Sequence, residues 1–175
     1  MNIPDIKSVI TDCPDFPKPG IIFKDITPLL QNPKLCSEVV HYLCQELKDL
    51  KIDAIAGIES RGFLFGMLLA QKLEIPFIPV RKVGKLPGKT IQQSYDLEYG
   101  SATIEIQEHA IKKDWKVMIH DDLLATGGTA MATADLLLKA GATVEAFSFL
   151  INLTFLNEQE PLKKYTNNII SVANY

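Results

Sequence analysis

A repeated unit of strand, polar turn and helix constrains the fold of this chain more than any other feature of its sequence. The apolar runs 52–58 and 116–120 each end in polar residues, and the stretches 62–72 and 130–140 that follow have helical character. A crossover of this length joins parallel strands and places each polar turn at the carboxyl end of its strand. We therefore predict an α/β domain with a mainly parallel central sheet and helices on both faces.

Other segments add elements to this plan. Apolar side chains between residues 33 and 51 recur at steps of three and four, which predicts an amphipathic helix. The apolar runs 75–80 and 143–153 predict two more buried strands. Residues 95–107 alternate unevenly and fit either a strand or a hairpin at the sheet edge.

The length and composition suit one domain. With 175 residues, 47% of them hydrophobic, the chain can bury one core, and we expect residues 1–175 to form a single domain. The net charge of -3 provides no electrostatic footprint for nucleic acid or an anionic membrane, so we expect neither as a partner. The longest mostly apolar run, residues 62–70, is well short of the roughly 20 residues that span a bilayer.

The N-terminal segment and the cysteines bear on location. Residues 1–10 contain no apolar block followed by a cleavage site, so nothing there resembles a signal peptide. Cys13, Cys36 and Cys44 form no C-x-x-C pair and cannot all pair internally, which favours a reducing compartment. We expect a cytoplasmic protein.

The segment 117–130 carries the most informative chemistry. An apolar strand ends at Asp121 and Asp122, and a turn of small residues then opens a helix. Such a turn aims backbone N–H groups and hydroxyls at a phosphate, and the helix dipole favours the anion. Adjacent carboxylates suit ribose hydroxyls, or Mg²⁺ held by them, so the pattern indicates a sugar phosphate. The turn consists of Ala125, Thr126, Gly127, Gly128 and Thr129.

Two better-known phosphate motifs are excluded. The chain has no G-x-G-x-x-G, and residues 84–90 (GKLPGKT) are one residue short of a Walker A motif. That segment contains a proline where the motif needs a backbone donor, and no helix follows it. An NTPase or a dinucleotide enzyme is therefore disfavoured.

Several segments resemble one enzyme family. Residues 121–129 (DDLLATGGT) resemble the signature of the type I phosphoribosyltransferases. Four more segments resemble the adenine phosphoribosyltransferases within that family, and they follow in the family's order. They are residues 16–28 (FPKPGIIFKDITP), 59–63 (ESRGF), 81–88 (RKVGKLPG) and 94–100 (SYDLEYG).

The resemblance implies a fold and a reaction. The fold is that of the type I phosphoribosyltransferases, with a base-binding segment over residues 1–32 and a flexible closing loop over residues 81–100. The reaction joins adenine and 5-phosphoribosyl-1-pyrophosphate to give AMP and pyrophosphate, with Mg²⁺ bound mainly through the substrate. A homodimer is also implied, and the apolar stretch 63–69 would suit its interface.

The same resemblance implies roles for the turn and the acidic pair. Residues 125–129 would hold the 5-phosphate, and Asp121 and Asp122 would engage the ribose hydroxyls. Both roles agree with the physical argument above. Displacement at the anomeric carbon passes through an oxocarbenium-like state, which carboxylates on one side and cations on the other would stabilise.

Cations near two strand ends are the pyrophosphate candidates. They are Arg61, Arg81 and Lys85, of which Arg61 and Lys85 are also catalytic candidates. On sequence alone, a solvated face explains such a cluster equally well. The resemblance further implies that Ser60 contacts substrate and that its peptide bond with Glu59 is cis.

The implied purine pocket draws on both ends of the chain. Phe23 would pack against the ring and Ile22 would bind through its backbone. Lys24 stands where the family usually has arginine, and it lacks the planar guanidinium fork. Leu153 is a further pocket candidate, in a segment, 152–159, that lacks the acidic start and Gly-Arg ending expected of the family.

Three more residues have open interpretations. Glu98 matches the family's candidate acid/base near the purine imidazole, although a surface strand carboxylate would be the ordinary interpretation. Tyr99 either closes the pocket or packs on the edge strand. His120 could tune the neighbouring carboxylates, but a satisfied histidine near the core is the commoner case.

Two alternatives to the adenine enzyme remain at this stage. One is a phosphoribosyltransferase for guanine, hypoxanthine or xanthine, which the segments around Phe23 and Glu98 disfavour. The other is a regulatory protein that senses phosphoribosyl pyrophosphate and binds nucleic acid. The acidic charge and the absence of spare residues for a helix-turn-helix disfavour it.

Overall fold

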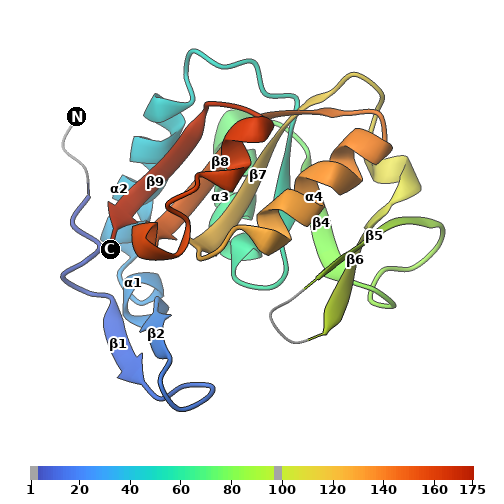
Figure 1. Ribbon diagram of the computed structural model, residues 1–175. Coiled ribbons are helices and arrows are strands. Elements are labelled where there is room, and N and C mark those ends of the chain that lie inside the picture. Colours follow the sequence, from blue (N-terminus) through green and yellow to red (C-terminus); the bar gives the residue numbers. More distant parts are fainter. Residues whose placement is uncertain (1–3, 97–99) are drawn as a thin grey trace.

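A seven-stranded sheet forms the centre of the computed structural model, which describes residues 4–96 and 100–175 (Figure 1). The strand order is β5-β6-β4-β3-β7-β8-β9. Strands β4, β3, β7, β8 and β9 run parallel, whereas β5 and β6 form an antiparallel hairpin at one edge. Their bounds are β3 Ala54–Ile58, β4 Phe77–Lys82, β5 Thr90–Asp96, β6 Ser101–Gln107, β7 Lys116–Leu124, β8 Thr143–Asn152 and β9 Ile169–Asn174.

Helices cover both faces of this sheet. α2 and α3 pack on one face and α4 on the other (Figure 1). Successive strand residues serve opposite faces: buried Met118 packs on the α2 and α3 side and buried Ile119 on the α4 side. The helical elements are α1 Thr27–Leu30, α2 Pro33–Glu46, α3 Gly62–Leu73, α4 Gly128–Lys139 and the short turns η1 Glu108–Ala110, η2 Thr154–Leu156 and η3 Pro161–Lys164. The predicted two-sided α/β domain is confirmed.

Two of the predicted boundaries that differ from the structure bear on the core and the acidic pair. The helix expected over residues 33–51 ends at Glu46, yet Leu47 is buried in the core, so the apolar spacing continues past the end of the helix. The strand expected to end at residue 120 continues to Leu124, because β8 runs beside it and pairs as far as Asn152. Both residues of the acidic pair therefore lie inside the strand.

The predicted edge segment, for which either a strand or a hairpin was expected, is a hairpin. β5 begins at Thr90, earlier than the expected start at residue 95, and β6 pairs with it along its whole length. Because β6 also pairs with β4, the hairpin lies beside the strand that carries Arg81. This places the loop between β4 and β5 close to the carboxyl end of β3.

A second, smaller sheet lies outside the main one. Strands β1 (Thr11–Pro14) and β2 (Ile22–Asp25) form an antiparallel hairpin that projects from the body of the molecule (Figure 1). Neither this hairpin nor β9 was expected from the sequence. The hairpin carries the segment that resembles a base-binding motif.

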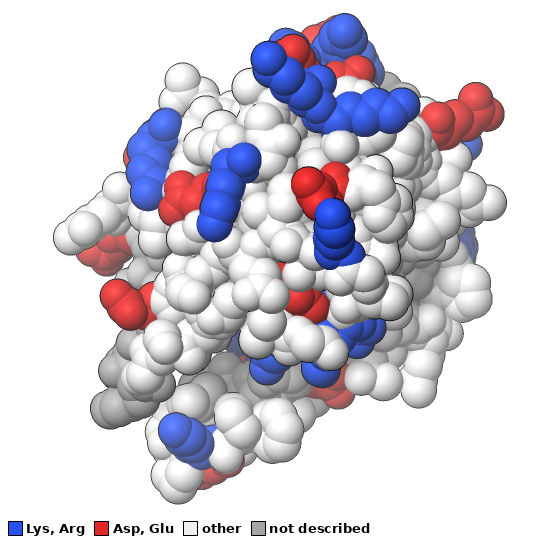
Figure 2. Space-filling view, turned by 90° about the vertical axis from the view of Figure 1, so that its right-hand side faces the viewer, with Lys and Arg blue, Asp and Glu red and all other residues white. Residues whose placement is uncertain are grey.

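The surface mixes charges of both signs. On the face in Figure 2, lysine and arginine side chains alternate with aspartate and glutamate, and wide uncharged areas separate them. Within residues 4–96 and 100–175, no helix has the length and apolar character needed to cross a membrane. The three cysteines are free thiols.

Candidate active site

The turn between β7 and α4 borders a cavity of about 390 Å³. Gly127 has φ +86°, a left-handed conformation that glycine adopts without strain, and α4 begins at the next residue. The first residues of the helix therefore line the cavity, where their N–H groups and the helix dipole attract an anion. We call residues 125–129 the phosphate loop.

The two carboxylates of β7 have different surroundings. Strand alternation separates their side chains: Asp121 lines the cavity of the phosphate loop, whereas Asp122 is 4% exposed and pairs with Arg61. Burial, followed by the neighbouring Asp122 charge, raises the pKa of Asp121 well above its ordinary value. Burial also raises the pKa of Asp122, and the Arg61 guanidinium opposes that shift. An arriving positive charge would favour the ionised forms.

Arg61 joins the two halves of the site. It precedes α3, and its Nε lies 2.9 Å from Asp122 Oδ2. Its Nη1 donates a hydrogen bond of 3.3 Å to the Lys24 carbonyl, and the guanidinium lies 4.6 Å from the centre of the Phe23 ring. A Cβ at Gly62 would lie 2.7 Å from the His120 carbonyl oxygen, so glycine is what lets the start of α3 approach β7 this closely.

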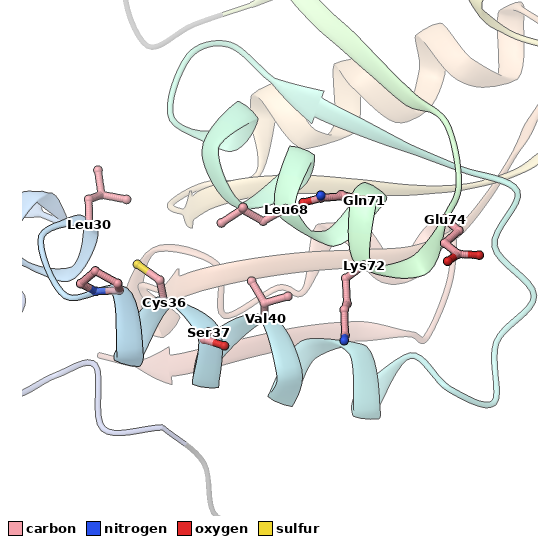
Figure 3. Close-up of a pocket in the computed structure, with 9 residues that line it drawn as sticks. Leu30, Cys36, Ser37, Val40, Leu68, Gln71, Lys72 and Glu74 are labelled. Atoms are coloured by element: carbon pink, nitrogen blue, oxygen red, sulfur yellow. The ribbon is translucent and has the colours of Figure 1, made fainter.

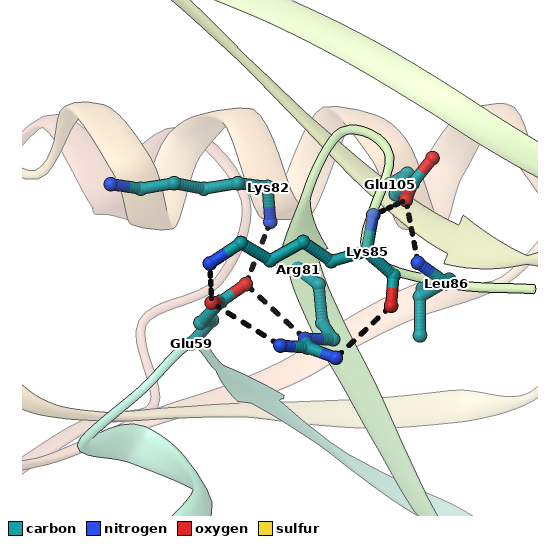
Figure 4. A network of polar contacts seen from close by, with 6 residues as sticks. All are labelled: Glu59, Arg81, Lys82, Lys85, Leu86 and Glu105. Atoms are coloured by element: carbon teal, nitrogen blue, oxygen red, sulfur yellow. Dashed lines mark hydrogen bonds and ion pairs between the residues drawn. The ribbon is translucent and has the colours of Figure 1, made fainter.

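Glu59 gathers the cations of the neighbouring strand (Figure 4). Its Oε1 lies 2.8 Å from Lys85 Nζ and its Oε2 lies 3.3 Å from Arg81 Nε, while the Lys82 amide donates to Oε2 at 3.0 Å. Burial raises the pKa of this carboxyl, but these hydrogen bonds and charges outweigh it and lower the pKa to about 2. The peptide bond between Glu59 and Ser60 is cis, as the resemblance implied.

A second buried carboxylate holds the turn after β4. Glu105 is 2% exposed, and its Oε1 accepts hydrogen bonds of 3.0 Å from the amides of both Lys85 and Leu86 (Figure 4). Gln92 donates to its other oxygen at 3.3 Å. Glu105 therefore shapes the turn from which the Lys85 side chain reaches Glu59.

A smaller cavity of about 290 Å³ connects these groups. Glu59, Arg81, Asp121 and Thr129 all line it. Tyr95 of β5 also lines this cavity, with its hydroxyl 3.2 Å from Thr129 Oγ1. Asp121 and Thr129 also line the cavity of the phosphate loop, so cations, carboxylate and loop adjoin one continuous region.

The base segment faces its own cavity of about 740 Å³. Phe23 and Arg61 line it, and the Phe16 ring meets the Phe23 ring edge to face with centres 5.1 Å apart. Ile22 is 58% exposed and does not line this cavity, so the role of its backbone stays a prediction. Phe23 is thus framed by an aromatic edge and a cation.

Lys24 points away from this cavity. Its Nζ lies 2.6 Å from Asp12 Oδ1 on the facing strand and 4.0 Å from the centre of the Tyr175 ring. Only the Lys24 carbonyl serves the site, through Arg61. The departure from arginine at this position therefore concerns the attachment of the hairpin to Tyr175.

Comparison with known proteins identifies the family. The family model for the phosphoribosyl transferase domain matches residues 25–168. An adenine phosphoribosyltransferase of Cytophaga hutchinsonii is 52% identical over 170 residues, covering 97% of this chain and 94% of the relative. Another, from Carboxydothermus hydrogenoformans, is 52% identical over 172 residues, covering 98% and 99%.

Solved structures agree in fold. The adenine phosphoribosyltransferase of Thermoanaerobacter pseudethanolicus superposes with a TM-score of 0.94 at 45% identity, covering 99% of this chain and 100% of that structure. The Giardia lamblia enzyme, complexed with 9-deazaadenine, has a TM-score of 0.93 at 35% identity, with coverage of 100% and 98%. This chain belongs to the adenine phosphoribosyltransferases. Its single domain has the type I phosphoribosyltransferase fold, as expected from the sequence.

Within this phosphoribosyltransferase, the geometry above gives no role to three of the candidate residues. Glu98 and Tyr99 fall outside the described residues. Leu153 is 8% exposed at the end of β8 and packs in the core on the α2 and α3 side, where it touches none of the three cavities. All three stay predictions.

His120 is a core residue. Its ring is fully buried, and Nδ1 lies 3.1 Å from Ser148 Oγ. Nε2 is buried with no hydrogen-bond partner in the part of the chain that the structure describes. Burial lowers the pKa of this imidazole to about 3, so the ring is neutral at physiological pH. The near-core interpretation is right, although only one of the two nitrogens is satisfied.

Some site residues carried no role in the sequence argument. Glu59 lies in one of the segments that resemble the family, but no function was predicted for it. The pattern that could have pointed to it is an acidic residue at the end of one predicted strand and a cluster of cations at the end of the next. Tyr95 and Glu105 gave no such signal, since edge-strand residues of these types are common. Asn157 lies in the segment that departs from the family pattern.

Among residues 4–96 and 100–175, no group of three or more His, Cys, Asp or Glu side chains is arranged to hold a metal ion. A cavity of about 630 Å³ lies between α2 and α3, where Cys36 and Val40 face Leu68 (Figure 3). It shares Leu30 with the cavity of the base segment, and it shares no lining residue with the cavities of 390 and 290 Å³.

Proposed function

We propose that this chain transfers the 5-phosphoribosyl group of 5-phosphoribosyl-1-pyrophosphate to adenine, giving AMP and pyrophosphate in purine salvage. The observation that carries the proposal is the position of Arg61, which contacts the ribose-side carboxylate Asp122 and the Phe23 ring at once. Sugar, leaving group and base would thus meet around one guanidinium. The family relationship supports the same reaction.

The phosphate loop would bind the 5-phosphate. Its backbone N–H groups and the hydroxyls of Thr126 and Thr129 are donors, and the start of α4 adds a favourable dipole. Asp121, which lines the same cavity, would then reach the ribose hydroxyls. As bond breaking at the anomeric carbon places positive charge on the ribose, the ionised forms of Asp121 and Asp122 would stabilise it.

The cations would stabilise the departing pyrophosphate. Arg81 and Lys85 are bound to Glu59, and their side chains remain 34% and 48% exposed, so each can contact an incoming anion. Arg61 would also turn towards the pyrophosphate, which releases Asp122 for the ribose. Ser60, between Glu59 and Arg61, would place its backbone at the same edge.

Mg²⁺ would arrive with the substrate. Mg²⁺ keeps several waters and binds through one or two carboxylates plus substrate phosphates, and it needs no protein cage. The carboxylate of Asp121, which lines the cavity of the phosphate loop, fits that mode. When bound, the ion would neutralise charge on the pyrophosphate. Its main ligands would be pyrophosphate oxygens and water.

The purine would lie against Phe23. The Ile22 backbone supplies a donor and an acceptor for the adenine edge, and Leu153 and Tyr99 would close the pocket. Glu98 would act as the acid/base near the purine imidazole. We expect Glu98→Gln to slow turnover well beyond its effect on substrate binding; unchanged turnover in steady-state assays would remove that role.

A homodimer and a cytoplasmic location complete the proposal. The outer face of α3 exposes Leu64, Met67 and Leu68 at 42%, 52% and 42%, while Phe65 and Leu69 are buried. Exposed apolar side chains on one helix face favour a partner, and the family argument names a second copy. Light scattering coupled to size exclusion would give the mass directly.

One experiment tests the function. The protein would be incubated with Mg²⁺, 5-phosphoribosyl-1-pyrophosphate and, separately, adenine, guanine, hypoxanthine, xanthine or orotate, and the products separated by chromatography. AMP formation alone is the expected result. Product with another base would overturn the adenine assignment, and no product with any base would overturn the proposed reaction.

A further inference from the structure

The back of the phosphate loop is covered by the segment that follows β8. In this segment residues 154–156 and 158–160 are exposed, whereas Asn157 between them turns inward and is partly buried. The segment is also the part of the chain that lacks the family's acidic start and Gly-Arg ending.

Asn157 makes the contacts that connect the segment after β8 to the phosphate loop. Its Nδ2 lies 2.9 Å from the carbonyl oxygen of Ala125, 2.9 Å from the carbonyl oxygen of Leu153 and 2.9 Å from Asn152 Oδ1. A side-chain amide carries two N–H donors and accepts nothing through its nitrogen, so three oxygens share these two hydrogens. One of them belongs to the phosphate loop and another to a purine-pocket candidate.

The contact with Ala125 sets the direction of a loop donor. The peptide unit is planar and trans, so its C=O and its N–H point in opposite directions. Holding the Ala125 carbonyl towards Asn157 thus directs the Thr126 N–H away from Asn157. Ala125 and Thr126 both line the 390 Å³ cavity, whereas Asn157 lines a separate cavity of about 180 Å³ behind the loop.

Two further contacts hold the loop from the same side. The Leu153 amide donates to the Leu124 carbonyl at 2.9 Å, immediately before the loop. A Cβ at Gly127 would lie 3.2 Å from Cγ of Pro161, so the start of η3 packs against the loop where its φ is positive. Asn157 supplies the one side-chain hydrogen bond in this set of contacts.

We propose that Asn157 is a positioning residue of the phosphate loop, which orients the Ala125–Thr126 peptide for the 5-phosphate and ties the loop to Leu153. It acts without touching the substrate. The inference rests on the proposed function in one respect, namely that this loop holds the 5-phosphate. It assigns a role in substrate binding to a residue outside the recognised motifs.

Two substitutions separate orientation from packing. Asn157→Asp keeps the shape but turns the donor into a carboxylate facing three oxygens, whereas Asn157→Ala removes the group. If Asn157 orients the loop, the isosteric Asp variant is the more damaging. We expect it to raise the KM for 5-phosphoribosyl-1-pyrophosphate about tenfold or more, since a donor is lost and repulsion is added, with kcat within about threefold of the parent. The KM of the Asn157→Ala variant should lie between those of the parent and of Asn157→Asp.

A matched control accounts for the added charge. Asn167 is exposed and lines the same 180 Å³ cavity. Asn167→Asp therefore makes the same change of charge beside the segment without replacing the donor to Ala125. We expect it to retain the parent KM.

Binding of ribose 5-phosphate by calorimetry tests the proposal independently of turnover and of the base. The expected result is a dissociation constant raised about tenfold in Asn157→Asp and unchanged in Asn167→Asp. Equal affinity in the parent and Asn157→Asp, or a larger loss in Asn157→Ala than in Asn157→Asp, would overturn the positioning role while leaving the proposed function intact. If the parent enzyme binds no ribose 5-phosphate, both the loop assignment and the inference are wrong.

Discussion

Single carboxylates in this molecule have roles set by what surrounds them. Glu59 is 11% exposed, and its two oxygens bind Arg81, Lys85 and a backbone amide, which keep the carboxylate ionised. Asp121 is partly buried, and the loss of solvation, followed by the neighbouring Asp122 charge, moves its pKa the other way. The surroundings of Glu59 suit a group that orients cations. Those of Asp121 suit a group that ionises when positive charge develops beside it.

Removing the charge of Glu59 should impair use of the pyrophosphate substrate. In Glu59→Gln the charge-assisted bonds to Arg81 and Lys85 become weaker neutral ones, so both cations lose their fixed positions. We expect kcat/KM for 5-phosphoribosyl-1-pyrophosphate to fall about tenfold, a loss of about 1.4 kcal/mol, and the KM for adenine to change little. Glu38→Gln, an exposed change of the same charge on α2, is the control. Parent-like kinetics in Glu59→Gln would contradict the orienting role.

The buried imidazole of His120 should make stability depend on pH. Its pKa is about 3 in the folded protein against an ordinary 6.5, so below pH 6.5 the unfolded chain binds a proton that the folded chain cannot. Stability from this group is therefore complete above pH 6.5 and decreases as the pH falls towards 3, by at most about 1.4 kcal/mol per pH unit.

His120→Asn tests this, because an amide can still bond to Ser148 but does not titrate. The raised pKa values of Asp121 and Asp122 act in the opposite sense, so the informative quantity is the difference between parent and variant. Urea unfolding at pH 7.5, 6.5, 5.5 and 4.5 should show the stability gap shifting in favour of the variant as pH falls. A constant gap would refute the assignment.

At the scale of elements, the β1–β2 hairpin depends on a distant residue for its position. Its ladder has four residue pairs, and a short two-stranded hairpin is marginal by itself in water. Lys24 bridges Asp12 and the Tyr175 ring, and Lys7 also lies 4.7 Å from the centre of that ring. The base segment is therefore held by contacts between the two ends of the described chain.

Lys24→Met should loosen the hairpin without unfolding the sheet. The loss of one partly exposed ion pair and one cation–π contact is expected to cost about 1 kcal/mol locally, which corresponds to roughly fivefold faster amide exchange in β1 and β2. Lys24→Arg, which keeps a cation able to stack on an aromatic ring, should exchange like the parent. Hydrogen exchange read by mass spectrometry measures both, and equal protection in the Met variant would contradict the anchoring role.

At the scale of the whole molecule, ligand binding should stabilise the fold. The site takes side chains from β2, β3, β4, β7 and the start of α4, so a ligand bound there contacts elements from most of the chain. AMP at 100 times its dissociation constant adds about 2.7 kcal/mol, which for a chain of 175 residues raises Tm by roughly 5–11 °C. Differential scanning fluorimetry with AMP and with GMP checks this. Equal shifts from the two nucleotides would contradict the adenine pocket.

The architecture follows from the local pattern of the sequence. Apolar runs of strand length, each followed by a polar turn and a helix, predict a parallel sheet, because burial on both faces and the crossover length leave few other solutions. The phosphate loop was predictable for a similar reason. Its glycines and threonines are neighbours in the chain, and Gly127 supplies the positive φ of the turn locally.

Contacts between distant segments were decided only by the tertiary structure. The pairing of Glu59 with Arg81 and Lys85 depends on which strands lie side by side, and the separation of Asp121 from Asp122 depends on β7 continuing beside β8. The links of Lys24 to Tyr175 and of Asn157 to Ala125 join segments far apart in the chain. Periodicity records which side of an element is buried, whereas the partner it meets there is set by the order and register of the whole sheet.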